Sequence, residues 1–140
     1  YLTPDDVGMH DGKLTRVKGA TDFNQLKPLR SAFKDLPQGF EHFYVFDNKD
    51  QSLDKIAYVE EPKSGRSMEV FTTEPSTLFY TGRYTSDNLK REDGTQFGKF
   101  RAFCIETSKY PNGPNIPNSP RTILNPDELY SETTVYKFNW

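Results

Sequence analysis

Residues 100–126 constrain the fold of this 140-residue chain more than any other stretch. Over residues 102–107 the side chains alternate in size, with Ala102, Cys104 and Glu106 on one side and bulkier residues on the other. This alternation predicts a half-buried strand whose bulky side packs on a core. The small side then faces a groove, and the carboxylate of Glu106 projects into it.

Five prolines follow this strand. Proline has a fixed φ angle and no backbone donor, so it excludes helix and central strand alike. The prolines are Pro111, Pro114, Pro117, Pro120 and Pro126. We therefore expect a stiff loop beside Glu106. The alternation alone does not indicate catalysis, because a lone glutamate in a strand is also typical of a solvated residue on an open sheet face.

Other stretches predict further strands separated by turns. Residues 19–37 predict at most a short helical turn, because Pro28 interrupts their helical spacing. The composition is rich in aromatic residues, with 11 Phe, 8 Tyr and 1 Trp, which favours an all-β domain spanning residues 1–140. The expected strands are 13–17 after a turn at Asp11 and Gly12, 39–47, a hairpin of 55–60 with 66–73, then 78–82 and 133–138.

Composition also limits the partners and the setting. With 18 Lys and Arg against 20 Asp and Glu, and no basic run, we expect no nucleic acid. No apolar run approaches the ~20 residues of a membrane span, so we expect no membrane. Cys104 is the only cysteine, which favours the cytoplasm. The chain opens at Tyr1 instead of Met, which predicts a processed product or a piece of a longer protein.

Motifs that bind metals or phosphates are missing from the sequence: it has no CxxC, no HExxH and no glycine-rich phosphate loop. We therefore expect no metal site. Glu41 and His42 stand together at the start of a predicted strand. Such a pair serves either as acid-base machinery or as a solvent-facing ion pair.

Several short motifs together resemble one known family. They are G-F-E-H at 39–42, E-V-F-T-T-E-P at 69–75, F-Y-T-G at 79–82, A-F-C-I-E-T at 102–107, P-N-G-P-N at 111–115, L-N-P-D-E at 124–128 and T-T-V-Y-K-F at 133–138. They are similar to the closing patterns of the galactose mutarotase (aldose 1-epimerase) family. The resemblance covers essentially the whole chain, but only the C-terminal half of the family.

The resemblance implies a fold and an activity. The fold would be an antiparallel β-sandwich of the galactose mutarotase-like type, with this chain as the C-terminal half of the supersandwich. The activity would be that of an aldose 1-epimerase, which interconverts the α and β anomers of hexoses such as galactose or glucose without a cofactor. Its partners would be an aldohexose and the N-terminal half of the same enzyme, as a separate or missing segment.

The resemblance also assigns roles to residues. Glu106 falls on the catalytic base, Glu41 on an aspartate that hydrogen-bonds sugar hydroxyls, and Glu74 on a glutamine near the sugar. The last two differ from the family pattern. Glu41 is one methylene longer than the family's aspartate, and Glu74 has an acceptor-only carboxylate where the family's glutamine has an amide donor. His42 falls on a family histidine that is not the acid. No residue of the chain matches the family's acid, so we expect this chain alone to be inactive.

Two alternatives stay open at this point. One is a non-catalytic carbohydrate-binding or regulatory module, for which Tyr80, Tyr84 and Tyr110 are candidate stacking residues. The other is a hexose-phosphate epimerase, which needs a basic cluster at the groove. Its candidate arginines, at positions 66, 83 and 101, are not grouped in the sequence.

Overall fold

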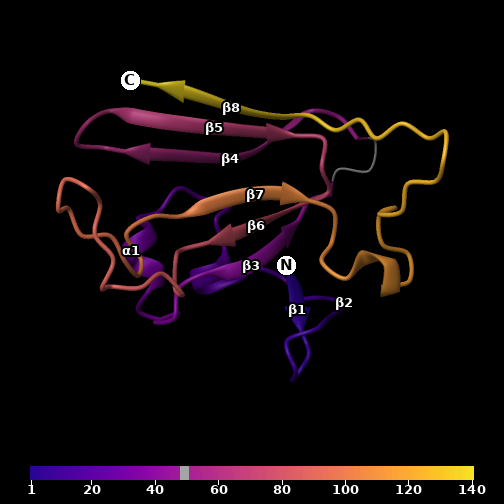
Figure 1. Ribbon diagram of the computed structural model, residues 1–140, viewed down its shortest axis with the longest axis horizontal. Coiled ribbons are helices and arrows are strands. Elements are labelled where there is room, and N and C mark those ends of the chain that lie inside the picture. Colours follow the sequence, from indigo (N-terminus) through magenta and orange to yellow (C-terminus); the bar gives the residue numbers. More distant parts are fainter. Residues whose placement is uncertain (48–50) are drawn as a thin grey trace.

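The computed structural model describes residues 1–47 and 51–140, and its regular secondary structure is mainly antiparallel strands in two sheets (Figure 1). Three short helical turns, η1 (Gly19–Thr21), α1 (Leu29–Ala32) and η2 (Gly113–Asn115), lie in the connections. The strands are β1 (Leu2–Pro4), β2 (His10–Leu14), β3 (Glu41–Val45), β4 (Asp54–Glu61), β5 (Arg66–Thr72), β6 (Ser76–Tyr80), β7 (Cys104–Ser108) and β8 (Thr134–Asn139). The expectation of an all-β fold is confirmed.

The larger sheet, which we call sheet A, has five strands in the order β2-β1-β3-β6-β7. Its centre is the β3–β6 pair, which runs in continuous register from Glu41↔Tyr80 to Val45↔Ser76. β6 then pairs with β7, which lies at the edge of the sheet. The predicted strands at 39–47, 78–82 and 102–107 thus become three neighbouring strands.

The smaller sheet, sheet B, has the order β4-β5-β8. β4 and β5 form the predicted hairpin, and the carboxylate of Glu61 closes its turn by accepting from the backbone N–H groups of Lys63 and Ser64 at 3.0 and 2.8 Å. Gly65 has a φ of +74°, a conformation that favours glycine. β8 adds to β5 from Thr72↔Thr134 onward, so two segments far apart in sequence complete this sheet.

Aromatic side chains form the core on one face of sheet A. Phe40 is fully buried, and its ring centroid lies 5.3 Å from that of Phe23 and 5.0 Å from that of Phe79. Phe23 comes from the connection that holds η1 and α1, so this connection covers that face of the sheet. Such offset aromatic contacts add to the stabilisation from buried area.

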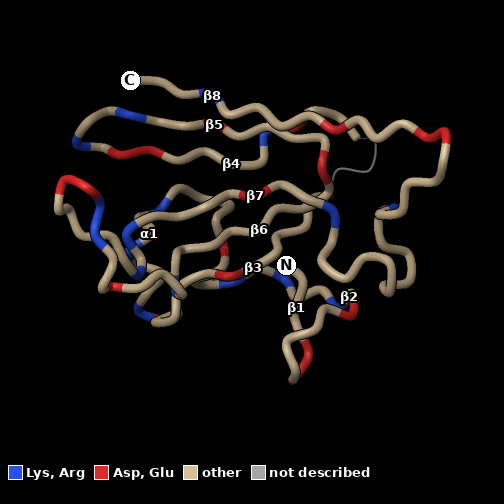
Figure 2. Tube along the Cα trace, viewed as in Figure 1, with Lys and Arg blue, Asp and Glu red and all other residues tan. Residues whose placement is uncertain are grey.

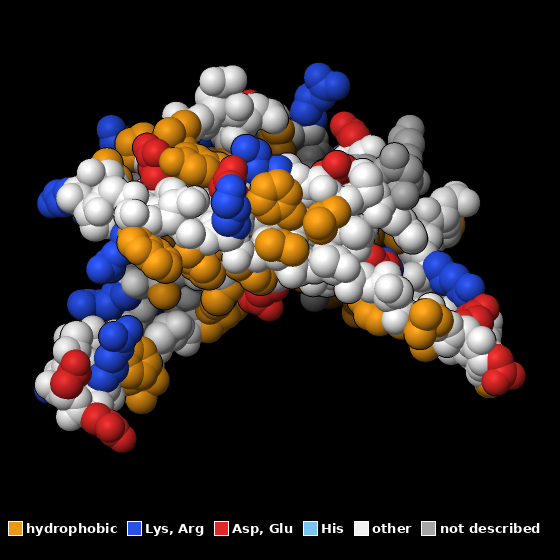
Figure 3. Space-filling view, turned by 90° about the horizontal axis from the view of Figure 1, so that it is seen from above, with side chains coloured by type: hydrophobic (Ala, Val, Ile, Leu, Met, Phe, Trp, Pro, Cys, Tyr) orange, Lys and Arg blue, Asp and Glu red, His pale blue; other side chains and the backbone are white. Residues whose placement is uncertain are grey.

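The chain leaves much surface uncovered. Its accessible surface is 10,199 Å², whereas a folded monomer of 16.2 kDa exposes about 7,500 Å². Large apolar side chains on β8 are open, with Phe138 59% exposed and Val135 40% exposed. Figure 3 shows apolar side chains open over much of the face seen from above. A domain of about this length usually buries about 68–70% of its unfolded surface, and this chain does not reach that fraction.

The first hairpin differs from the expectation. The turn lies at residues 5–9 instead of at Asp11 and Gly12, because the side chain of Asp5 accepts from the backbone N–H groups of Val7 and Met9 at 3.0 and 2.7 Å. Gly12 sits inside β2 with a φ of +94°. A Cβ there would lie 2.6 Å from Cγ2 of Ile116, so close packing also requires glycine.

Two remaining findings concern helices. The short turn α1 confirms the expectation of at most a short helical turn in residues 19–37. None of the helices in residues 1–47 and 51–140 has the length and the apolar character that a membrane crossing needs.

Candidate active site

Glu106 lies in β7, and the sheet register fixes its neighbours. Phe43 of β3 pairs with Leu78 of β6, and Leu78 pairs with Glu106, so these three side chains form one row across sheet A. Glu106 is exposed and has neither a hydrogen bond nor an ion pair with any residue that the structure describes. Cys104 is also exposed, while Ile105 on the other face is half-buried, as the alternation predicts.

Glu41 lies on the same face of sheet A as Glu106. Glu41 pairs with Tyr80, and Tyr80 pairs with Cys104, which is two residues from Glu106. Strand spacing and rise then put the Cα atoms of the two glutamates roughly 12 Å apart. Figure 2 shows an acidic position on both β3 and β7. The structure thus brings together two of the three carboxylates that the sequence singles out.

An arginine and two tyrosines surround Glu41. Nη1 of Arg83 lies 3.4 Å from Oε2 of Glu41, and its guanidinium lies over the ring of Tyr84 at 4.7 Å from the centroid. The rings of Tyr80 and Tyr84 are stacked at 6.3 Å. The hydroxyl of Tyr80 accepts from the backbone N–H of Tyr84 at 2.9 Å. This cluster combines aromatic faces with charged groups, which suits a polyhydroxylated ligand.

His42 faces away from this site. Side chains alternate along β3, so His42 lies on the covered face, with its ring 4.9 Å from Tyr1 and 5.5 Å from Phe40. Burial and the nearby N-terminal ammonium lower the pKa of His42, although Glu41 acts in the opposite direction. His42 and Glu41 therefore do not act as an acid-base pair on one ligand.

Glu74, the third predicted site residue, lies between β5 and β6 and is only 4% exposed. Its Oε1 accepts from the hydroxyl of Tyr130 at 2.6 Å, and its Oε2 lies 3.0 Å from Nζ of Lys109. Lys109 also bonds the carboxylate of Glu132. The structure places Glu74 in a nearly closed ionic cluster instead of on the open face that holds Glu106.

The cluster shifts the pKa values of Lys109 and Glu132. Burial lowers the pKa of Lys109, but hydrogen bonds to Glu132 and Glu74 outweigh this and raise it overall. Burial raises the pKa of Glu132, but hydrogen bonds from Lys109 and Thr73 outweigh this and lower it. Both groups therefore stay charged across the neutral range.

The sequence interpretation missed the residues around Glu74, because Lys109, Tyr130 and Glu132 carry no motif of their own. The residues around Glu41 were named only for the two alternatives: Tyr80 and Tyr84 for a carbohydrate-binding module, and Arg83 for a hexose-phosphate epimerase. One indication was available: a carboxylate in place of an amide at position 74 needs a cation nearby if it is buried. The identity of that cation depends on the fold.

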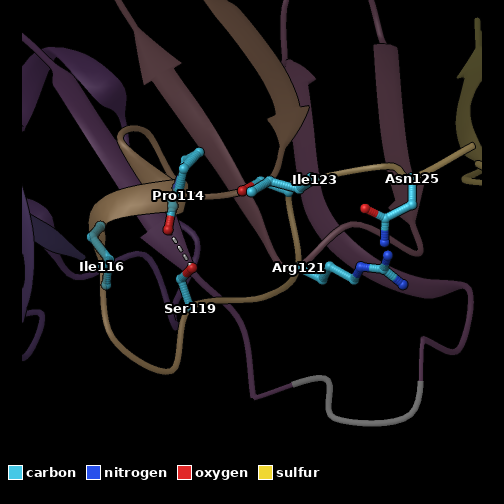
Figure 4. Close-up of a pocket in the computed structure, with 8 residues that line it drawn as sticks. Pro114, Ile116, Ser119, Arg121, Ile123 and Asn125 are labelled. Carbon is cyan, nitrogen blue, oxygen red and sulfur yellow. Dashed lines mark hydrogen bonds between the residues drawn. The ribbon is translucent and has the colours of Figure 1, made fainter.

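The proline-rich loop forms a separate pocket of about 370 Å³ (Figure 4). It is lined by Gly113, Pro114, Ile116, Ser119, Arg121, Thr122, Ile123 and Asn125. The hydroxyl of Ser119 donates to the carbonyl of Gly113 at 2.7 Å and holds the loop closed. No carboxylate lines this pocket, so we do not assign it to acid-base chemistry. Residues 1–47 and 51–140 contain no group of three or more His, Cys, Asp or Glu placed to hold a metal ion.

Comparisons with known proteins identify the class. The family model for aldose 1-epimerase matches residues 1–137, so the chain belongs to the aldose 1-epimerase family. Galactose mutarotases of Homo sapiens and Bos taurus are 36% and 35% identical to it, and the alignments cover 99% of this chain. An aldose 1-epimerase of Escherichia coli (strain K12) is 28% identical over 99% of the chain.

A solved structure is similar in fold. The crystal structure of a GalM/aldose epimerase homologue from C. elegans matches with a TM-score of 0.79 at 22% identity, over 99% of this chain and 42% of that one. At this identity the likeness concerns the fold alone. The chain spans about two fifths of the length of the curated relatives it matches, at 41% of the human and bovine proteins.

Proposed function

We propose that this chain supplies the base and part of the sugar pocket of an aldose 1-epimerase that interconverts the α and β anomers of an aldohexose. The observation that carries the proposal is the common face of sheet A on which Glu106 and Glu41 lie. Glu106 has no partner there among the described residues, so its carboxylate is available to take up a proton. Membership of the aldose 1-epimerase family supports the same reaction.

The proposed chemistry needs one base and one acid. Glu106 takes the proton from the C1 hydroxyl while an acid protonates the ring oxygen, and the C1–O5 bond breaks to give the open-chain aldehyde. The aldehyde turns about the C1–C2 bond, and the ring closes on the other face of C1 as both protons return. Each group in such a reaction contributes on the order of 10²–10⁴ to the rate. Glu41, held by Arg83, accepts hydrogen bonds from sugar hydroxyls.

We propose that a segment equivalent to the N-terminal half of the enzyme completes the site. Two observations support it: the chain exposes more surface than a monomer of its mass, and it spans 41% of its human relative. His42 faces away from Glu106, so it is not the acid. Since no residue of this chain matches the family's acid either, we propose that the acid comes from the completing segment.

The cellular setting is part of the proposal. Cys104 is a free and exposed thiol, which is compatible with a reducing compartment. We place the protein in the cytoplasm.

Polarimetry tests the proposal. Freshly dissolved α-D-galactose and α-D-glucose are followed to equilibrium with the chain, alone and together with the N-terminal half of a relative, and with the same mixtures carrying Glu106→Gln. We expect acceleration in the mixture and a loss of about 10²–10⁴ in the variant. Sugar binding that persists with no acceleration in either mixture identifies a non-catalytic carbohydrate-binding module instead. Equal acceleration by both forms would show that Glu106 is not the base.

A further inference from the structure

β7, which carries Glu106, is weakly held by its backbone. Among the described residues it pairs with β6 alone, from Ser76↔Ser108 to Tyr80↔Cys104, and it ends sheet A. A strand with one hydrogen-bonded neighbour opens more readily than a central strand. The orientation of Glu106 therefore depends on other contacts that hold β7.

Three side-chain contacts join β7 and the residue after it to β8 and the segment before β8. We call them the β7–β8 ladder: the Tyr136 hydroxyl donating to the Ile105 carbonyl at 2.9 Å, the Thr107 and Thr134 hydroxyls at 2.7 Å, and Nζ of Lys109 bonding the Glu132 carboxylate. Every second residue from 105 to 109 takes part, and the partners run in the opposite direction. The contacts of the ladder therefore follow an antiparallel register, although no backbone hydrogen bonds join β7 and β8.

The ladder lies behind Glu106. Successive side chains of a strand point to opposite faces, so Thr107 points toward sheet B while Glu106 points to the open face of sheet A. The contacts hold the residues on both sides of Glu106. They restrain its backbone without touching its carboxylate.

The Lys109 end of the ladder is the strongest contact. Lys109 bridges Glu132 and Glu74, and the three side chains are 18%, 11% and 6% exposed. An ion pair that is this well shielded from water costs much when one partner is removed, because the remaining charge is left unpaired. The other two contacts of the ladder are hydrogen bonds between neutral groups and are weaker.

We propose that Lys109 is a positioning residue for Glu106. By bridging Glu74 and Glu132, it fixes the end of β7 three residues beyond the base and so sets the direction of the Glu106 carboxylate. This role rests on the proposed function of Glu106, and it assigns Glu74 to the support of the site instead of to sugar contact.

Hydrogen exchange in the 140-residue chain tests this role without any need for turnover. Lys109→Met removes the bridge, and Lys55→Met is the matched control, because Lys55 also pairs with a glutamate, Glu69, but is 52% exposed. We expect amide exchange in β7 to become at least about tenfold faster in Lys109→Met, with β3 unchanged. The control should leave β7 unchanged. Equal acceleration in every strand, or none in β7, would overturn the proposal.

A second variant tells whether faster exchange in β7 comes from loss of the Lys109 bridge or from the unpaired charges that Lys109→Met leaves behind. Combining Lys109→Met with Glu74→Gln and Glu132→Gln removes all three charges. If the bridge positions β7, exchange in β7 stays fast in this triple variant. Restored protection would show that Lys109 only neutralises its neighbours, which contradicts a positioning role.

Kinetics of the completed enzyme provide the readout on function. We expect Lys109→Met to lower kcat by about tenfold with KM within about twofold, because the base is misdirected while sugar contacts remain. Lys109→Arg should recover most of kcat. A change in KM alone would overturn the proposal. If Glu106→Gln leaves the rate intact, the proposed function fails, and the exchange experiment still decides whether Lys109 holds β7.

Discussion

The open face of sheet A and the corner between β5 and β6 each hold a carboxylate that the family resemblance assigns to the sugar site. On the open face, Glu106 is exposed and has no partner in the described part of the chain. In the corner, Glu74 is 4% exposed and bonded to Tyr130 and Lys109. The family resemblance assigns both glutamates to the sugar site, yet their surroundings differ. Glu106 is available for proton transfer, whereas Glu74 is fixed by its hydrogen bond and ion pair.

Removing each carboxylate in turn gives the sharpest contrast. We expect Glu74→Ala to lower the free energy of unfolding by about 3 kcal/mol, because Lys109 loses one of two shielded partners and the Tyr130 hydroxyl loses its acceptor. Glu106→Ala should change it by less than about 0.5 kcal/mol, because Glu106 has no such partner. Urea unfolding of the two variants measures both values. Equal losses would remove the distinction between the two carboxylates.

The pH dependence of stability tests the same corner with a smaller expected effect. The pKa of Glu132 is lower in the folded chain than its ordinary 4.5, so its contribution is complete above about pH 4.5 and is lost as the pH falls through the folded pKa. The pKa of Lys109 is raised above its ordinary 10.5, so its contribution is present below that pH and is lost as the pH rises through the folded pKa. Stability should therefore fall more steeply below pH 4.5 in the wild type than in Glu132→Gln. Thermal unfolding at a series of pH values checks this, and parallel curves would contradict it.

The smallest effect concerns the far end of the β7–β8 ladder. Tyr136→Phe removes one hydroxyl, whose one hydrogen bond in the described part of the chain is to the Ile105 carbonyl. We expect a loss of about 0.5–1 kcal/mol in unfolding free energy, the usual net contribution of a neutral hydrogen bond. A loss as large as that of Glu74→Ala would show that the ladder is held equally along its length and not mainly by Lys109.

The fold could be predicted from the sequence largely because its signals are local. Alternation located β5 and β7, and the turn residues around Gly65 located the β4–β5 hairpin. The first turn was misplaced because an Asp-Gly pair is a strong turn signal, whereas the side chain of Asp5 closes the turn that forms. The sequence could not indicate that Ile116, from the distant proline-rich loop, packs on Gly12.

The site was predicted less completely. The register that puts Glu41 and Glu106 on one face follows from the pairing of β3, β6 and β7, which no motif in the sequence specifies. The state of Glu74 was not predictable, because it depends on Lys109 and Tyr130 from segments whose proximity only the folded chain creates. Local patterns predict where a side chain points, but not which charges it meets.

The pairing of β8 with β5 has a consequence for protein synthesis. Thr72 pairs with Thr134 and Ser67 with Asn139, so the two strands are separated by 62 to 72 residues in the chain. At a translation rate of about 5–20 residues per second, β5 waits roughly 3–14 s at the ribosome for its partner. During that interval the β4–β5 hairpin presents an uncovered edge to other nascent chains. Protection of the β5 edge during that interval therefore matters more for this chain than for one whose paired strands are adjacent in sequence.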